Sequence, residues 1–411
     1  MTFNKKKILK NITFRAITVF LGKLLSFVIV PILARYLGPE SFGEYSYIIV
    51  IAGYTTLGVN FGFLAFGTRS IAYDPINASK NVNTILSTRI IVGVFTFIVL
   101  SILSLITPII SNYYYAFLLI IIGEAFFVDF YFYGKKNVLI PSLAHLFAQS
   151  LFILLAIFIA YSDLGLTKLI YSFAISKLFE ASFLMVFYLR EHYLVLRFNL
   201  KTHVKILKMI FPLGFGNKLS FLKNSIPVLL IPIVLNYEAL GYYSGFMKFV
   251  GIISAGLQIL FLPLGPFIAE KRNDENIKRY IKYFIGALFF TGIFFSFMAF
   301  LTMNVIIEFL LGNEFIGIIE IFPFGSFTII FIQPLYLGTI LLVNYLGADK
   351  AFLKISFLSF LIAIIFIPIL LQFWGIVGAF LGSFISSFIF ISLLVYKLIS
   401  DKNAHLPKHI N

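Results

Sequence analysis

Residues 12–36 read ITFRAITVFLGKLLSFVIVPILARY. An α-helix needs about 20 apolar residues to cross the hydrocarbon core of a bilayer, and this run is long enough. Lysines precede it, as in a signal peptide, but the run is too long for a signal h-region and contains no small-residue cleavage site. We therefore predict that it forms a first transmembrane helix.

The composition extends this prediction to the whole chain. Of its 411 residues, 60% are hydrophobic and 12% are charged, whereas soluble domains are about 45–50% apolar and about 25% charged. One soluble core of this size could not bury so much apolar surface, but lipid accepts it on the outside of a helical protein. The sequence predicts an all-α polytopic membrane protein embedded in a lipid bilayer.

Twelve apolar segments are predicted along the chain. They lie at about residues 12–36, 43–66, 85–107, 113–133, 138–161, 165–189, 209–235, 239–265, 280–304, 317–346, 351–373 and 375–397. A polar stretch from Arg190 to Lys208 separates the first six from the last six. We accordingly expect two six-helix halves, residues 1–200 and 201–411.

Lysine and arginine collect in alternate loops of this plan. One side holds Lys5 to Arg15, Arg69, Lys80, Arg89, Lys135, Lys136, Arg190 to Lys208, Lys271 to Lys282, Lys350, Lys354, Lys397, Lys402 and Lys408. The loops of the other side hold only Arg35 and Lys168. Because cytoplasmic loops are enriched in these residues, both termini are predicted to be cytoplasmic. The net charge of +15 then reflects topology, and no nucleic acid is expected as a partner.

A short motif occurs twice, about half a chain apart. Glu40-Ser-Phe-Gly43-Glu-Tyr45-Ser46 recurs as Glu238-Ala-Leu-Gly241-Tyr-Tyr243-Ser244. Both copies stand at the start of the second span of their half. Because each half has an even number of spans, the halves enter the membrane from the same side and form parallel repeats. This plan is typical of transporters.

Four stretches carry a family resemblance. Leu33-Ala-Arg-Tyr-Leu-Gly-Pro-Glu-Ser-Phe-Gly-Glu-Tyr45, followed by Asn60-Phe-Gly62 and Gly67-Thr-Arg69, resembles the opening signature of bacterial polysaccharide flippases of the O-antigen and capsule type. That family belongs to the superfamily that also holds the lipid II flippase and the MATE exporters. Asp129-Phe-Tyr-Phe-Tyr-Gly134-Lys is similar to the end of the family's fourth span, although the family often has Trp at the position of Tyr131.

The resemblance implies a fold, a substrate and a location. The expected fold is two six-helix bundles that face each other across a central cavity. The implied substrate is a polyprenyl-diphosphate-linked oligosaccharide, which is moved from the cytoplasmic to the outer leaflet of the bacterial plasma (inner) membrane for surface polysaccharide biosynthesis at the cell envelope. A polysaccharide polymerase machinery is then an expected partner.

Basic side chains inside the spans are the candidates for binding this substrate, since an ionisable group at the bilayer centre costs at least about 2.5–3.5 kcal/mol. A cationic lining suited to a diphosphate is predicted from four lysines, Lys23, Lys218, Lys223 and Lys248. Arg69 and Arg89 are predicted at the cytoplasmic mouth, where they could contact the headgroup first. Each lysine could instead extend its stem and place its ammonium group at the membrane interface.

Prolines, glycines and polar residues crowd the segment 209–235, which predicts an interrupted helix at a cavity. Asn217 and Asn224 share one face of it and are further candidates for substrate binding. The alternative is a proline kink whose freed backbone groups are satisfied by neighbouring helices.

Acidic side chains in the fourth span are candidates for coupling transport to H+ or Na+. These are Glu124 and Asp129, of which Glu124 is the better candidate because Asp129 could simply pair with Lys135. Lys177 and Glu180 are three residues apart, a spacing that favours a local ion pair. His145 is expected to pack or to form a hydrogen bond rather than to bind a ligand.

Several chemistries are not expected. The chain contains no Cys, no phosphate-binding G-x-x-x-x-G-K-[ST] loop and no metal-binding pattern, so we predict no enzyme, no cofactor and no metal. Transport would then depend on an ion gradient, the substrate gradient or a partner.

An ion-coupled multidrug antiporter of the same fold is the main alternative to a flippase. It is disfavoured because a positive cavity repels cations. A membrane glycan polymerase ranks third because the predicted external loops are short.

Overall fold

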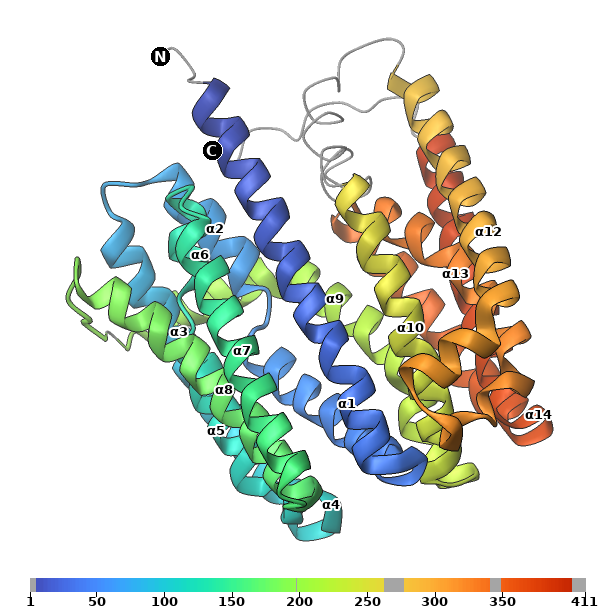
Figure 1. The fold of residues 1–411 in the computed structure, drawn as a ribbon. Helices are drawn as coiled ribbons and strands as arrows, with labels where there is room; N and C mark the ends of the chain where they lie inside the picture. The colour runs from blue at the N-terminus through green and yellow to red at the C-terminus, as the bar shows by residue number, and fades with distance from the viewer. Residues whose placement is uncertain (1–4, 197, 262–276, 341–348, 401–411) are drawn as a thin grey trace. The chain divides into compact units, whose positions relative to one another are not determined.

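The computed structural model describes residues 5–196, 198–261, 277–340 and 349–400, and all regular secondary structure within these ranges is helical (Figure 1). The helices are α1 (Lys5–Val59), α2 (Phe63–Tyr73), α3 (Ala78–Ile106), α4 (Pro108–Asn112), α5 (Tyr114–Ala125), α6 (Asp129–Gly134), α7 (Leu139–Tyr161), α8 (Gly165–Leu189), α9 (Leu200–Val234), α10 (Tyr237–Phe261), α12 (Ile277–Leu310), α13 (Ile318–Ile340) and α14 (Asp349–Ser400). A short 3-10 helix, η1 (Asn313–Phe315), precedes α13. The predicted all-α class is confirmed.

Seven stretches of the described residues are long and apolar enough to cross a membrane. They are Val28–Tyr73, Ala78–Ile106, Tyr114–Gly134, Leu139–Tyr161, Gly165–Leu189, Ile285–Met303 and Lys350–Lys397. The chain is therefore a multi-pass membrane protein, as predicted. The first and last of these stretches have 46 and 48 residues, roughly twice the length that one crossing requires.

Both long stretches contain a glycine that breaks the helix. Gly38 in α1 has φ 66° and ψ 174°, and Gly375 in α14 has φ 57° and ψ −139°. A side chain with a Cβ is strained in such conformations, so glycine is favoured there. Each break falls at a point where the sequence separates two predicted spans, and α1 and α14 each consist of two helical segments.

The predicted segment 113–133 differs from expectation because it is not one helix. α5 ends at Ala125 and α6 begins at Asp129. Asp129 Oδ1 accepts a hydrogen bond of 2.8 Å from the backbone N–H of Phe130, which satisfies one of the donors that a helix start leaves free. This interrupted helix was not predicted from the sequence.

The interruption that the sequence predicts in residues 209–235 is absent. α9 is helical without a break from Leu200 to Val234, so that prediction was wrong. Each proline removes one backbone hydrogen bond, but the other bonds of the helix can remain. Ser225 Oγ donates to the Phe221 carbonyl oxygen of its own helix at 2.7 Å, which keeps this hydroxyl satisfied within α9.

Contacts divide the chain into two compact units. The first comprises Met1–Tyr36 and Tyr45–Gly214, and the second comprises Leu37–Glu44 and Phe215–Asn411. Within the first unit, α5 packs on α3 and α8, α7 packs on α8, and α2 packs on α3 and α6. Within the second, α13 packs on α12, α10 and α14. The segment Leu37–Glu44, which carries the first copy of the repeated motif, thus groups with the second half of the chain.

The small residues of the family motif explain how closely α2 and α6 approach. A Cβ on Gly67 would overlap the Phe130 ring, and a Cβ on Gly134 would lie 2.7 Å from the Cβ of Ile71. Phe130 and Ile71 are both buried in the core of the first unit. These glycines therefore allow α6 to pack directly on α2.

Candidate functional site

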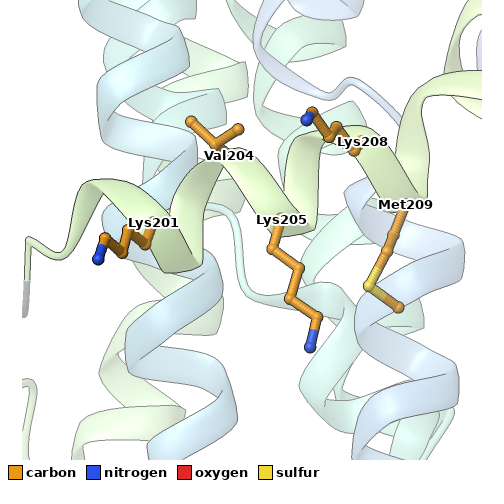
Figure 2. Close-up of a pocket in the computed structure, with 5 residues that line it drawn as sticks. All are labelled: Lys201, Val204, Lys205, Lys208 and Met209. Atoms are coloured by element: carbon orange, nitrogen blue, oxygen red, sulfur yellow. The ribbon is translucent and has the colours of Figure 1, made fainter.

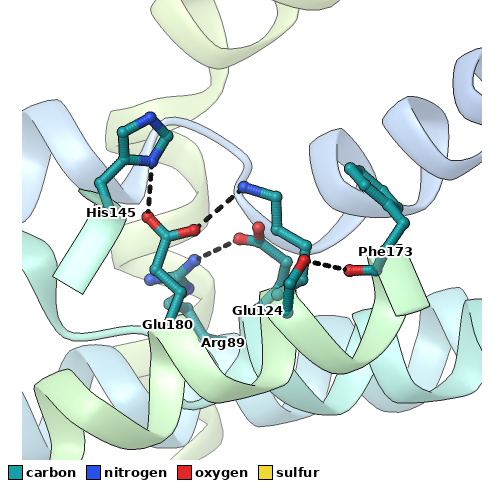
Figure 3. A network of polar contacts seen from close by, with 7 residues as sticks. Arg89, Glu124, His145, Phe173 and Glu180 are labelled. Atoms are coloured by element: carbon teal, nitrogen blue, oxygen red, sulfur yellow. Dashed lines mark hydrogen bonds and ion pairs between the residues drawn. The ribbon is translucent and has the colours of Figure 1, made fainter. Parts of the chain in front are cut away.

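Arg89 of α3 lies at the interruption between α5 and α6. Its side chain has 0% exposure, and its Nη2 lies 3.3 Å from Oε2 of Glu124 in α5 (Figure 3). Its Nη1 donates to the Phe127 carbonyl oxygen, in the short segment between the two helices. Because a helix end leaves carbonyl groups without partners, the guanidinium provides donors to the broken helix and to a carboxylate at the same time.

A second group of charges surrounds Glu180 of α8. Lys177 Nζ donates to Glu180 Oε2 at 3.0 Å, and His145 Nδ1 of α7 lies 3.1 Å from Glu180 Oε1 (Figure 3). Since an ionised carboxylate only accepts hydrogen bonds, His145 is the donor. The predicted Lys177–Glu180 pair and the predicted hydrogen-bonding role of His145 are both confirmed.

Asp129 is buried in α6 and does not form the ion pair suggested from the sequence. Lys135 is exposed, and its Nζ lies 5.9 Å from the centre of the Tyr131 ring instead. Within the described ranges, the hydrogen bond that Asp129 accepts is the one from Phe130. We call the set of Arg89, Glu124, Asp129, His145, Lys177 and Glu180 the polar cluster of the first unit.

The two arginines expected at the cytoplasmic mouth have different environments. Arg69 of α2 is exposed. Arg89 is fully buried, and this burial does not favour a first contact with the headgroup. Glu124 and the Phe127 carbonyl group compensate for the desolvation of its charge.

The predicted basic residues of the second unit lie mainly on α9. Lys223 is only 6% exposed, and its Nζ lies 5.4 Å from the centre of the Phe390 ring of α14. That distance suits a cation–π interaction. No carboxylate of the described residues forms an ion pair with Lys223.

The remaining candidates are more open or are not described. Lys218 is partly buried in α9, whereas Asn224 of α9 and Lys248 of α10 are exposed. The side chains of Lys23 and Asn217 lie outside the described part of the structure. Six candidates for substrate binding lie on α1, α9 and α10. Among those whose side chains are described, Lys223 is the buried cation.

Sequence reasoning missed two polar contacts that involve histidine. The Tyr131 hydroxyl lies 2.7 Å from His192 Nε2 and 3.2 Å from Glu191 Oε2. Thr88 Oγ1 lies 2.8 Å from His203 Nδ1. For the contact between Tyr131 and His192, the sequence offered one indication: Tyr131 occupies a position where the polysaccharide flippases that the chain resembles often have Trp. Both contacts join residues about 60 or more positions apart, which one sequence does not reveal.

Taken together, the apolar helical spans and the ionisable groups buried among them define the class of the chain as a multi-pass membrane protein. Among the described residues, no group of three or more His, Cys, Asp or Glu side chains could hold a metal ion. The chain belongs to the polysaccharide biosynthesis protein family, whose sequence profile matches residues 8–270. This match confirms the resemblance seen in the motifs of the first two spans.

One curated relative matches over almost its entire length. The capsular polysaccharide biosynthesis protein CapF of Staphylococcus aureus is 24% identical over 407 residues, which cover 92% of this chain and 96% of the relative. The shared region therefore includes both halves of the chain.

Two solved structures have the same fold. The lipid II flippase MurJ in an inward closed conformation matches with a TM-score of 0.70 and 16% identity, over 94% of this chain and 88% of that one. An inward-facing multidrug resistance MATE family transporter of the MOP superfamily matches with a TM-score of 0.67 and 12% identity, over 94% and 95% of the two chains. These two likenesses show that the chain shares their fold.

Proposed function

We propose that this protein is a flippase that moves polyprenyl-diphosphate-linked oligosaccharide repeat units from the cytoplasmic to the outer leaflet, for surface polysaccharide such as O-antigen or capsule. The observation that carries the proposal is Lys223, a buried ammonium group without a carboxylate partner among the described residues. A buried cation is costly unless something compensates it. In a family of polysaccharide biosynthesis proteins, a diphosphate on a lipid carrier is the compensating anion that best fits.

The proposed membrane arrangement is the predicted one of twelve spans, in halves 1–200 and 201–411 around a central cavity, with both termini cytoplasmic and the protein in the plasma membrane. The breaks at Gly38 and Gly375 support it, because each divides a stretch too long for one crossing. The lengths of α9, α10, α12 and α13, from 23 to 35 residues, are also sufficient for crossings.

The proposed substrate site contains Lys223 and Lys218 as the cations nearest to the diphosphate. Lysine binds phosphate as a point charge and needs no fixed fork geometry. Lys23, Lys248, Asn217 and Asn224 stay predicted members of the site, and Arg69 stays a candidate for first contact with the headgroup. Arg89 is better understood as a positioning residue, because its donors are directed to Glu124 and Phe127.

Glu124 is the proposed coupling residue. A proton or Na+ at this carboxylate would compete with Arg89, which lies 3.3 Å away, for the same negative charge. Release of Arg89 would remove a donor from the interruption between α5 and α6, and would thereby couple ion binding to the shape of the fourth span. Asp129, which is buried in the same unit, is the second candidate.

An ion-coupled multidrug antiporter is the alternative function, and the similarity to the MATE family transporter favours it. Gene deletion in the host distinguishes the two functions. A flippase predicts loss of surface polysaccharide and accumulation of lipid-linked repeat units in the inner leaflet. An antiporter predicts normal polysaccharide and increased sensitivity to cationic dyes, and that result would refute the flippase proposal. Single repeat units displayed outside without polymer would indicate a glycan polymerase instead.

A further inference from the structure

The first turns of α9 present three lysines on one exposed face. Lys201, Lys205 and Lys208 are spaced by four and three residues, so they share one side of the helix. With Val204 and Met209 they line an open groove of about 380 Å³ (Figure 2). We call it the lysine groove, and its lining within the described part of the chain includes no acidic side chain.

The opposite face of the same turns is fixed to the first unit. His203, Ile206 and Ile210 are buried, and both isoleucines belong to the core that contains Phe63 and Tyr188. His203 Nδ1 lies 2.8 Å from Thr88 Oγ1, and its Nε2 accepts the backbone N–H of Asn199 at 3.1 Å. The rotation of the helix is therefore set by packing, and the lysines are held outward.

Exposed apolar side chains adjoin the lysines. Leu200, Val204, Met209 and Phe211 are all exposed, although the same helix buries other apolar residues. A helix at the lipid–water boundary places such side chains among acyl chains and its lysines at the level of the headgroups. The predicted topology also puts residues 190–208 on the cytoplasmic side, where basic residues near a membrane attract anionic lipids.

We propose that the lysine groove binds the phosphate group of an anionic phospholipid of the inner leaflet. Three ammonium groups in an open groove, whose described lining holds no carboxylate, complement one phosphodiester headgroup, and the exposed apolar side chains accommodate the adjoining acyl chains. The groove lies in the first unit, whereas Lys218 and Lys223 belong to the second. The proposal therefore does not depend on what the protein transports.

The test uses the purified full-length protein in a neutral detergent, with phosphatidylglycerol and phosphatidylcholine of identical acyl chains as probes and native mass spectrometry as the readout. The variant K201Q/K205Q/K208Q removes the three charges. The control K80Q/K350Q/K354Q removes the same charge from three other exposed lysines on the same predicted side. We expect the wild type and the control to prefer phosphatidylglycerol, and the first variant to bind it roughly 100-fold more weakly.

Three outcomes of the comparison between the two phospholipids would overturn the proposal. They are equal binding of the two lipids by the wild type, full retention of phosphatidylglycerol by K201Q/K205Q/K208Q, and an equal loss in the control variant. If the triple variant does not fold, each single substitution should weaken binding roughly 5-fold without loss of the folded protein. A polyprenyl diphosphate that displaces phosphatidylglycerol from the groove at equal concentration would assign the groove to a different lipid and would also refute the proposal.

Discussion

Gly43 and Gly241 occupy equivalent positions in the two copies of the repeated motif, and each lies against the backbone of the other copy. A Cβ on Gly43 would overlap the Tyr237 carbonyl group, and a Cβ on Gly241 would overlap that of Pro39. Each of these carbonyl groups lies four residues before the glycine of its own copy. Such a reciprocal contact is what a two-fold axis between the copies produces. The repeat therefore marks a close helix crossing within the second unit.

This contact predicts that Gly241→Ala destabilises the protein. The new methyl group would meet the Pro39 carbonyl group, and overpacking of this kind costs about 1–3 kcal/mol. Gly251→Ala is the matched control, because Gly251 lies in the same helix and a methyl group there would have nothing within 4 Å. Thermal unfolding in detergent should show a lower midpoint for G241A than for G251A. Equal midpoints would mean that the crossing is looser than the structure indicates.

Much of the fold can be predicted from the sequence, because apolar runs, glycine positions and short residue spacings determine structure within a few residues of themselves. The breaks at Gly38 and Gly375 coincide with predicted loops, and the spacing of Lys177 and Glu180 predicts the pair that forms. The break between α5 and α6 is different, since Phe126, Phe127 and Val128 are as apolar as their neighbours and contain no helix-breaking residue.

That break depends on a tertiary contact. The Arg89 guanidinium donates a hydrogen bond to the Phe127 carbonyl oxygen, and the two residues are 38 positions apart. The sequence around residue 127 therefore does not indicate that this donor is present. The opposite error arises in α9, where prolines locally favour an interruption but the helix continues through them. The buried position of Arg89 was missed for the same reason, because Glu124 compensates its charge from another helix.

Arg89 is expected to stabilise the first unit. Arg89→Met would leave the Glu124 carboxylate without its cation, and removal of one partner of a buried pair costs about 3–5 kcal/mol. The double variant R89M/E124Q should recover part of this loss, because it removes the uncompensated charge. The measurement is the unfolding midpoint in detergent, with the exposed Arg69→Met as control. A midpoint for R89M equal to that of R69M would contradict the role of Arg89 as a positioning residue for the fourth span.

Lys223 is expected to be required for surface glycan. Lys223→Ala and Lys218→Ala should each abolish surface polysaccharide while membrane abundance stays unchanged, because the diphosphate would lose a counter-charge. Lys223→Arg, which keeps the charge, should retain part of the activity. Lys354→Ala removes an exposed lysine of α14 and serves as the control. Wild-type glycan in both single variants and in the double variant would exclude a cationic substrate site on α9.

The roles of Glu124 in coupling and in stability can be separated experimentally. Glu124→Gln keeps a hydrogen-bond acceptor for Arg89 but removes the charge that a proton or Na+ would neutralise. In proteoliposomes loaded with a lipid-linked oligosaccharide, the wild type should flip faster when an H+ or Na+ gradient is imposed, and E124Q should flip at one rate with or without it. Asp129→Asn tests the second carboxylate by the same comparison. If E124Q lowers the unfolding midpoint but still responds to the gradient, the Arg89–Glu124 pair is structural, and coupling must be sought at Asp129 or outside the polar cluster.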